Sequence, residues 1–213
     1  MQAVIFDVDG TLLDSNAAHA EAWARALSEH GVPRDAAQIR PLIGMGSDKL
    51  LPTMGLETGS PVARAVASRK KQLFAEQLPR LHPTPGARAL LTFLREQGTT
   101  LVVATSADDD EMEAILGQAG VSDLIPRRTS SDDAERSKPD PDIVLAALQQ
   151  SASRPQATTM IGDTPYDIEA ARQSAITAIA LRCGGYWTDR DLGRALAIFD
   201  DPTDLLRYWQ SGS

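Results

Sequence analysis

The chain has 213 residues, of which 42% are hydrophobic and 23% are charged, and its formal net charge is −8 at pH 7. This length suits one compact domain, or one domain that carries a smaller insertion. The acidic balance argues against a nucleic-acid-binding or membrane-surface protein, because such proteins usually gather Lys and Arg in patches.

Five short apolar runs recur along the chain, and most of them precede a helical pattern. They lie at residues 3–6, 101–104, 123–126, 158–161 and 177–180, and the third is the weakest. Continuous rather than alternating apolar character is typical of strands that are covered on both faces of a parallel sheet. Strands that alternate with helices predict right-handed crossovers, and therefore an α/β fold with a Rossmann-like, doubly wound parallel sheet.

The first apolar run ends in Asp7-Val8-Asp9-Gly10-Thr11. Ligands bind beyond the carboxyl ends of strands in open parallel sheets, so Asp7 and Asp9 would face the expected crevice. Two residues apart on an extended chain, their side chains would share one face, and Gly10 would let the backbone turn away. A nucleophile beside a proton donor is chemically sensible, although a bare Asp-x-Asp-Gly is at least as often an ordinary turn.

The segment between the first two apolar runs is too long for a single crossover helix. It has helical patterns throughout, of which the longest covers residues 61–77, and a proline-containing stretch at residues 82–86 bounds its far side. The sequence therefore predicts a small, all-helical cap domain at residues 15–82. This cap would be inserted into an α/β core formed by residues 1–14 and 83–213.

Three further polar motifs follow later in the chain. Thr105-Ser106 ends the second run, where a hydroxyl and a backbone N–H can hold a phosphate oxygen. Lys138 precedes a proline on a stiff segment that can aim its ammonium at a phosphoryl group. Asp163 ends the fourth run, and Asp167 follows on the first turn of a helix, so both offer the oxygen ligands that Mg²⁺ prefers. Each motif alone is also explained by helix capping, a solvated lysine or helix-dipole charges.

All four motifs occur in order, each near a predicted strand end, and as a set they resemble the haloacid dehalogenase superfamily. The resemblance is to the branch with a helical cap after the first strand, which includes phosphoglycolate phosphatases and β-phosphoglucomutase. Asp9 separates the chain from the dehalogenases proper, which lack an acid at the matching place. The matching segments are Phe6-Asp7-Val8-Asp9-Gly10-Thr11-Leu12-Leu13-Asp14-Ser15, Thr105-Ser106, Ser137-Lys138-Pro139, and Gly162-Asp163-Thr164 through Asp167.

The resemblance implies a Mg²⁺-dependent phosphatase that forms an aspartyl-phosphate on Asp7. Asp9 would be the general acid and base and would offer its backbone carbonyl to the metal. Asp7 and Asp163 would ligate the metal directly. Asp167 would act through a water molecule or by orienting Lys138.

The same resemblance assigns the phosphoryl group to three residues of the core. Thr105 and the Ser106 amide would bind its oxygens, and Lys138 would offset the negative charge on Asp7 and phosphate. Such transfer depends mostly on positioning and charge neutralisation, so these residues and one Mg²⁺ suffice.

Substrate choice would belong to the cap. His19 stands at a position that resembles the histidine of the mutase's first cap helix, but helix packing explains it equally well. The Gly-rich turn around Gly44 opens a helix and would reach the substrate, with Arg40 and Lys49 as anion contacts. Residues 69–71, Arg-Lys-Lys, could supply a further cap cation.

Three functions remain open, and hydrolysis of a phosphoglycolate-type or sugar-phosphate ester is favoured. A β-phosphoglucomutase-like activity is the alternative, but residues 107–110, Ala-Asp-Asp-Asp, would repel the second phosphate that a mutase holds. A catalytically silent binding module would have lost Asp7, Asp9, Lys138 or Asp163, and all four are present.

The expected partner is a small-molecule phosphate ester, with no nucleic acid and no membrane, in a monomer or homodimer. Cys183 is the only cysteine, which excludes an intrachain disulfide and suits a reducing compartment. The first residues lack the pattern of a secretory signal, and no run of about 18 apolar residues exists, so a cytoplasmic location is expected.

Overall fold

A parallel six-stranded sheet forms the centre of the computed structural model, which describes residues 1–212. The strand order is β3-β2-β1-β4-β5-β6, so β1 lies between β2 and β4 and the order reverses there. A crevice for ligands forms beyond the carboxyl ends of the strands at such a reversal. The strands are β1 (Ala3–Phe6), β2 (Thr100–Ala104), β3 (Arg127–Thr129), β4 (Thr158–Gly162), β5 (Thr177–Leu181) and β6 (Ala197–Phe199).

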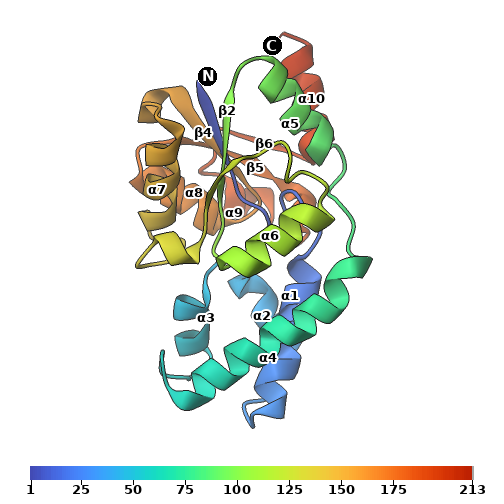
Figure 1. Cartoon of the computed structure of the whole chain (residues 1–213), viewed down its shortest axis with the longest axis vertical. Coiled ribbons are helices and arrows are strands. Elements are labelled where there is room, and N and C mark those ends of the chain that lie inside the picture. Colours follow the sequence, from blue (N-terminus) through green and yellow to red (C-terminus); the bar gives the residue numbers. More distant parts are fainter. Residues whose placement is uncertain (213) are drawn as a thin grey trace.

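Both faces of the sheet are covered by helices, which explains the continuous apolar runs of the strands (Figure 1). Val4 and Phe6 of β1 belong to the same apolar cluster as residues of α5, α6 and α10. Ile5, one position between them, belongs to a second cluster with residues of α7, α8 and α9. These helices are α5 (Ala87–Glu96), α6 (Asp109–Gln118), α7 (Asp142–Ser151), α8 (Pro165–Gln173), α9 (Asp189–Leu192) and α10 (Pro202–Gln210).

The chain between β1 and β2 forms a separate helical layer at the carboxyl-terminal edge of the sheet, in the lower half of Figure 1. Trp23 and Leu27 of α1 are buried in the same apolar cluster as Val66 and Phe74 of α4. The predicted helix at residues 61–77 is confirmed, and Ser60 caps it by accepting a hydrogen bond from the Ala63 amide. The four α-helices of this layer are α1 (Asn16–Glu29), α2 (Ala36–Ile39), α3 (Ser47–Thr53) and α4 (Pro61–Gln77).

The predicted third strand is wrong in position. Residues 123–126 form a turn that buries Leu124 and Ile125, and β3 begins directly after it. β6 was not predicted. Short 3-10 helices complete the fold at Arg40–Leu42, Leu78–Arg80, Ser131–Asp133, Pro155–Ala157 and Arg182–Gly184.

No helix within residues 1–212 is both long enough and apolar enough to cross a membrane.

Candidate active site

Three neighbouring strands bring polar side chains to one point at the carboxyl-terminal edge of the sheet. Asp7 directly follows β1, Thr105 follows β2 and Asp163 follows β4, and all three are buried. The Asp7 amide still donates to the Ile161 carbonyl of β4, at 2.9 Å, so the strand register itself fixes the start of the loop. The parallel topology thus explains why these three motifs share one edge of the sheet.

Lys138 joins this cluster from the chain between β3 and α7. Its ammonium donates to Asp7 Oδ1 at 2.5 Å, to Asp167 Oδ1 at 2.7 Å and to the Ala104 carbonyl at 3.1 Å. Burial opposes the charged form of Lys138, but the carboxylates of Asp167 and Asp7 outweigh this effect and raise its pKa. Lys138 is therefore a fixed positive charge in contact with the carboxylate of Asp7.

Three buried carboxylates, of Asp7, Asp163 and Asp167, form a potential cation site. One oxygen from each lies within 4.8 Å of the others. Burial raises the pKa of Asp7 to about 7, although Lys138 opposes the shift. Burial, followed by the charges of Asp7 and Asp167, also raises the pKa of Asp163 well above its usual value. Hard oxygen donors with excess negative charge are the donor set that suits Mg²⁺, so these residues fit the metal.

The loop after β1 wraps closely around Asp163. Gly10 has a φ of +76°, and a Cβ at this position would collide with the side chains of Asn16 and Asp163. Asn16 Nδ2 donates to Asp163 Oδ2 at 2.7 Å and to the Gly184 carbonyl at 3.3 Å. Asn16 Oδ1 is buried and has no hydrogen-bond partner among residues 1–212. Asn16 is a site residue that sequence reasoning missed, since nothing in its motif distinguishes it from an ordinary first residue of a helix.

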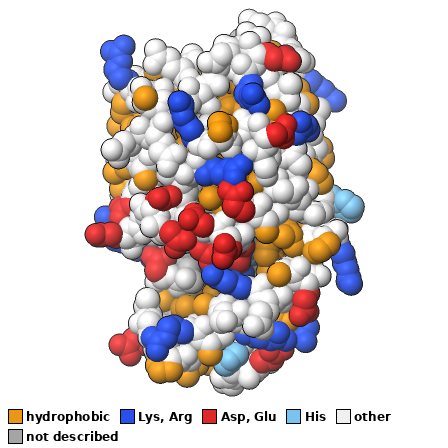
Figure 2. Space-filling view, in the orientation of Figure 1, with side chains coloured by type: hydrophobic (Ala, Val, Ile, Leu, Met, Phe, Trp, Pro, Cys, Tyr) orange, Lys and Arg blue, Asp and Glu red, His pale blue; other side chains and the backbone are white. Residues whose placement is uncertain are grey.

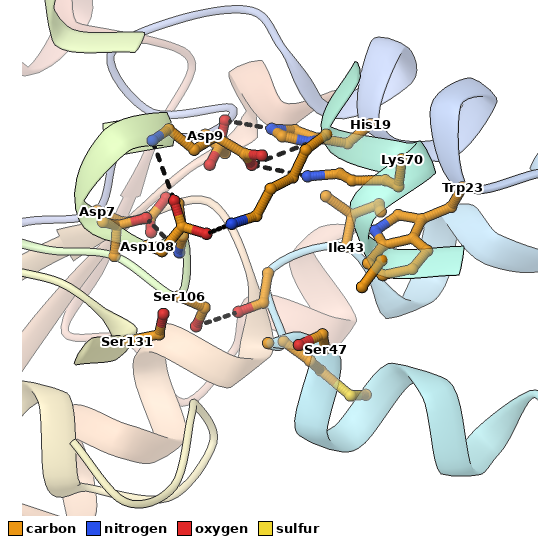
Figure 3. Close-up of a pocket in the computed structure, with 18 residues that line it drawn as sticks. Asp7, Asp9, His19, Trp23, Ile43, Ser47, Lys70, Ser106, Asp108 and Ser131 are labelled. Carbon is orange, nitrogen blue, oxygen red and sulfur yellow. Dashed lines mark hydrogen bonds and ion pairs between the residues drawn. The ribbon is translucent and has the colours of Figure 1, made fainter. Parts of the chain in front are cut away.

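Asp9 is held from the side of α1. Its Oδ1 accepts from Ser15 Oγ at 2.5 Å and lies 2.7 Å from His19 Nε2 (Figure 3). Burial opposes ionisation of Asp9, but His19 and then Ser15 outweigh it and lower its pKa to about 2. The His19 ring also stacks on Phe74, with centroids 3.8 Å apart. His19 is thus packed within the helical layer and also contacts Asp9, and its role in substrate binding stays a prediction.

A cavity of about 110 Å³ opens between the strand ends and the helical layer, and Figure 3 shows side chains from both converging on it. The core contributes Asp7, Asp9, Thr105, Ser106, Ala107, Asp108, Glu111 and Ser131, and the helical layer contributes His19, Trp23, Ile43, Gly44, Met45, Gly46, Ser47, Ala67, Lys70 and Lys71.

Two of the sequence-predicted cap residues do not reach this cavity. Arg40 and Lys49 are absent from its described lining, and each makes a contact outside it. Arg40 donates to the Gly184 carbonyl at 2.5 Å, and Lys49 pairs with Asp140 at 2.5 Å. Gly44 does line the cavity, and its carbonyl accepts from Ser106 Oγ at 3.2 Å.

Known proteins with similar sequences include phosphatases, and solved structures with a similar fold include a hydrolase and, at 22% identity, a putative β-phosphoglucomutase of Bacteroides vulgatus. Residues 4–181 match the family model described as haloacid dehalogenase-like hydrolase. The chain is 31% identical over 192 residues to a probable phosphatase, IndB, of Dickeya dadantii, a match that covers 88% of this chain and 84% of the other. It is 30% identical over 216 residues to a phosphoglycolate phosphatase of Rhodospirillum rubrum, covering 96% and 89%. A hydrolase from Pseudomonas syringae has a similar structure, with a TM-score of 0.91 at 30% identity over 99% of both chains.

Proposed function

Because this chain belongs to the haloacid dehalogenase-like hydrolases, we propose that it is a Mg²⁺-dependent phosphatase of small phosphate monoesters. The observation that carries the proposal is the cluster of Asp7, Lys138, Asp163 and Asp167 at the carboxyl-terminal edge of the sheet. A carboxylate nucleophile, one fixed ammonium and a hard cation site are the parts that phosphoryl transfer requires.

Asp7, Asp163 and the backbone carbonyl of Asp9 would hold the metal, and Asp167 would support it through water and by orienting Lys138. Bound Mg²⁺ supplies positive charge against the phosphoryl oxygens and the Asp7 carboxylate. The 2.7 Å contact between Asp167 and the Lys138 ammonium supports the orienting role.

In the first step, Oδ2 of Asp7, the oxygen that Lys138 does not contact, attacks phosphorus, and the bond from phosphorus to the leaving oxygen breaks. Asp9 would deliver a proton to that oxygen after the negative charge of the bound ester has raised its pKa from the low value of the empty site, so the product leaves as a neutral alcohol. In the second step, water attacks the aspartyl-phosphate while Asp9 takes the water proton, which regenerates Asp7 and releases inorganic phosphate. Ser15 and His19 keep the Asp9 carboxylate in place throughout.

The phosphoryl group would bind to Thr105 and to the Ser106 amide, which follow β2 beside Asp7. Lys138 holds one oxygen of Asp7, so only the other oxygen is directed at phosphorus. We further propose that residues 15–82 act as the cap and that Lys70 and Lys71, rather than Arg40 and Lys49, are the cap lysines that lie beside the substrate.

The direct test is phosphate release from a small monoester, with and without Mg²⁺, by the wild type and two variants. Asp7→Asn should abolish turnover, because the amide is a far weaker nucleophile, while Asp14→Asn, an exposed change in the same loop, should retain it. Activity of Asp7→Asn within a few-fold of the wild type would exclude the covalent mechanism.

A further inference from the structure

The part of the cavity that would face the leaving group contains two lysines, and both are already paired. Lys70 Nζ donates to Glu111 Oε1 at 2.7 Å, and Lys71 forms an ion pair with Asp108 (Figure 3 shows Lys70 and Asp108). Each pair joins α4 to the start of α6, across the cavity. The charges of these four lining residues therefore cancel.

Breaking the Lys70–Glu111 ion pair costs considerable free energy because both side chains are buried. Its side chains are only 8% and 11% exposed. If a substrate anion took Lys70 for itself, Glu111 would remain as an unpaired carboxylate, 3.9 Å from His19 Nδ1. Breaking a buried ion pair so that one charge stays unpaired is strongly destabilising. A second anionic group on the substrate could therefore pair with Lys70 only at a high free-energy cost.

Asp108 is fixed in the same way by its own helix. It caps α6 by accepting a hydrogen bond from the Glu111 amide at 3.1 Å, while its other oxygen faces Lys71. A carboxylate that caps a helix is stabilised by the N-terminal dipole, so it does not move aside easily. The two acids of α6 thus keep both cap lysines neutralised.

The surface around this rim adds negative charge. Figure 2 shows carboxylates gathered over α6 and over the segment that follows β3. A surface of one sign repels ligands that carry additional charge of that sign. The exposed carboxylates of these two segments are Asp109, Asp110, Glu113, Asp132, Asp133 and Glu135.

Apart from Asp7, Asp9 and His19, the remaining lining is uncharged. Trp23, Ile43 and Met45 offer apolar surface, and Ser47 and Ser131 offer hydroxyls. Such a mixture suits the carbon skeleton and hydroxyl groups of a short sugar or polyol, and it provides no unpaired cation for a carboxylate.

We propose that the substrate is a phosphate monoester with an uncharged, hydroxylated leaving group, and that Asp108 and Glu111 exclude esters that carry a carboxylate or a second phosphate. This proposal rests on the proposed phosphatase function and narrows its substrate class. It selects sugar-phosphate or polyol-phosphate esters over phosphoglycolate, and hydrolysis over a mutase reaction that must hold a second phosphate.

Two esters of nearly equal size test the proposal, 2-hydroxyethyl phosphate and 2-phosphoglycolate, which differ by a hydroxymethyl group in place of a carboxylate. With Mg²⁺, the wild-type kcat/KM should favour 2-hydroxyethyl phosphate by at least about tenfold. Asp108→Asn, which keeps a good helix cap, and Glu111→Gln should each lower this ratio by about fivefold, the effect of one nearby charge in a solvated site. Asp110→Asn is the matched control, since it removes the same charge from an exposed position of α6.

Binding to the Asp7→Asn protein separates this proposal from the proposed function, because binding requires no turnover. In calorimetry with Mg²⁺, 2-hydroxyethyl phosphate should bind more tightly than 2-phosphoglycolate. If 2-hydroxyethyl phosphate binds more tightly but the wild type hydrolyses neither ester, the phosphatase function is refuted and the leaving-group preference stands. Hydrolysis with equal or reversed preference, or a ratio that Asp108→Asn and Glu111→Gln change no more than Asp110→Asn, would overturn the preference alone. If neither ester is bound or hydrolysed, both proposals are wrong.

Discussion

The carboxylate cluster at the strand ends has a measurable consequence for the stability of the metal-free protein. Asp7, Asp163 and Asp167 share one ammonium, that of Lys138, so two negative charges stay uncompensated when all three acids are ionised. Replacing Asp7 with Asn removes one of these charges and leaves an oxygen that still accepts from Lys138. We therefore expect metal-free Asp7→Asn to unfold at a higher temperature than the metal-free wild type at neutral pH.

The magnitude follows from the pKa of Asp7, which burial raises from its ordinary 3.8 to about 7. A carboxyl group whose pKa is raised by folding holds its proton more tightly in the folded state. Its favourable contribution to the free energy of unfolding is therefore fully present below about pH 4 and is lost as the pH rises towards 7. The shift is about three units at about 1.36 kcal/mol each, so ionising Asp7 costs on the order of 4 kcal/mol at pH 7. For a chain of this length, even half of that corresponds to a Tm change of roughly 4–8 °C.

The assay is thermal and urea unfolding of chelator-treated protein at pH 4.5 and pH 7.5. Asp7→Asn should gain stability over the wild type at pH 7.5 and match it near pH 4.5, where the wild-type carboxyl is protonated. Asp14→Asn, an exposed change in the same loop, should show no such pH-dependent difference. Added Mg²⁺ should stabilise the wild type more than Asp7→Asn. An equal effect of Asp7→Asn at both pH values, or no gain at pH 7.5, would refute the electrostatic reasoning.

Three further outcomes are expected. Chelation should abolish phosphate release, and Mg²⁺ should restore it where Ca²⁺ does not, because Ca²⁺ takes more ligands at longer distances. In activity titrations with Mg²⁺, Asp163→Ala should raise the metal concentration needed far more than Asp167→Ala, and equal effects would contradict their direct and indirect roles. Asp9→Asn should slow the single-turnover release of the leaving group by at least about 100-fold for an alkyl phosphate but much less for p-nitrophenyl phosphate, whose leaving group needs no proton; equal losses in this first step would exclude Asp9 as the acid.

The four central strands were predicted from the sequence, and the two edge strands were not, for different reasons. β1, β2, β4 and β5 are apolar runs because neighbouring strands and helices bury them. β3 and β6 lie at the two edges, and β3 begins with Arg127 and Arg128, which show no apolar run. The apolar pair Leu124 and Ile125 just before β3 is buried in a turn, and this pair drew the predicted strand to the wrong residues. β6 lies at the end of the apolar run at residues 195–199, so its sequence does carry a strand signal, which was overlooked.

The core and the cap differ in predictability for a related reason. A residue that follows a parallel strand must lie at the carboxyl-terminal edge, so Asp7, Thr105 and Asp163 could be placed together from topology alone. Which cap lysine reaches the cavity depends on how α4 packs over α6, a contact between distant segments that no local pattern encodes. Sequence reasoning therefore favoured Lys49, which pairs with Asp140, whereas Lys70 lines the cavity.

The net charge of the site differs between the places where the metal, the phosphoryl group and the leaving group would bind. Without a cation, the strand-end cluster repels a phosphate dianion, so ester binding must depend on the metal. A divalent cation would cancel the two uncompensated charges, because Lys138 already offsets the third through its contacts with Asp7 and Asp167. The Thr105 hydroxyl and the Ser106 amide N–H could then donate to one phosphoryl group, together with the metal. Since Lys70 and Lys71 are neutralised by Glu111 and Asp108, no comparable charge remains in the described lining for a second anion.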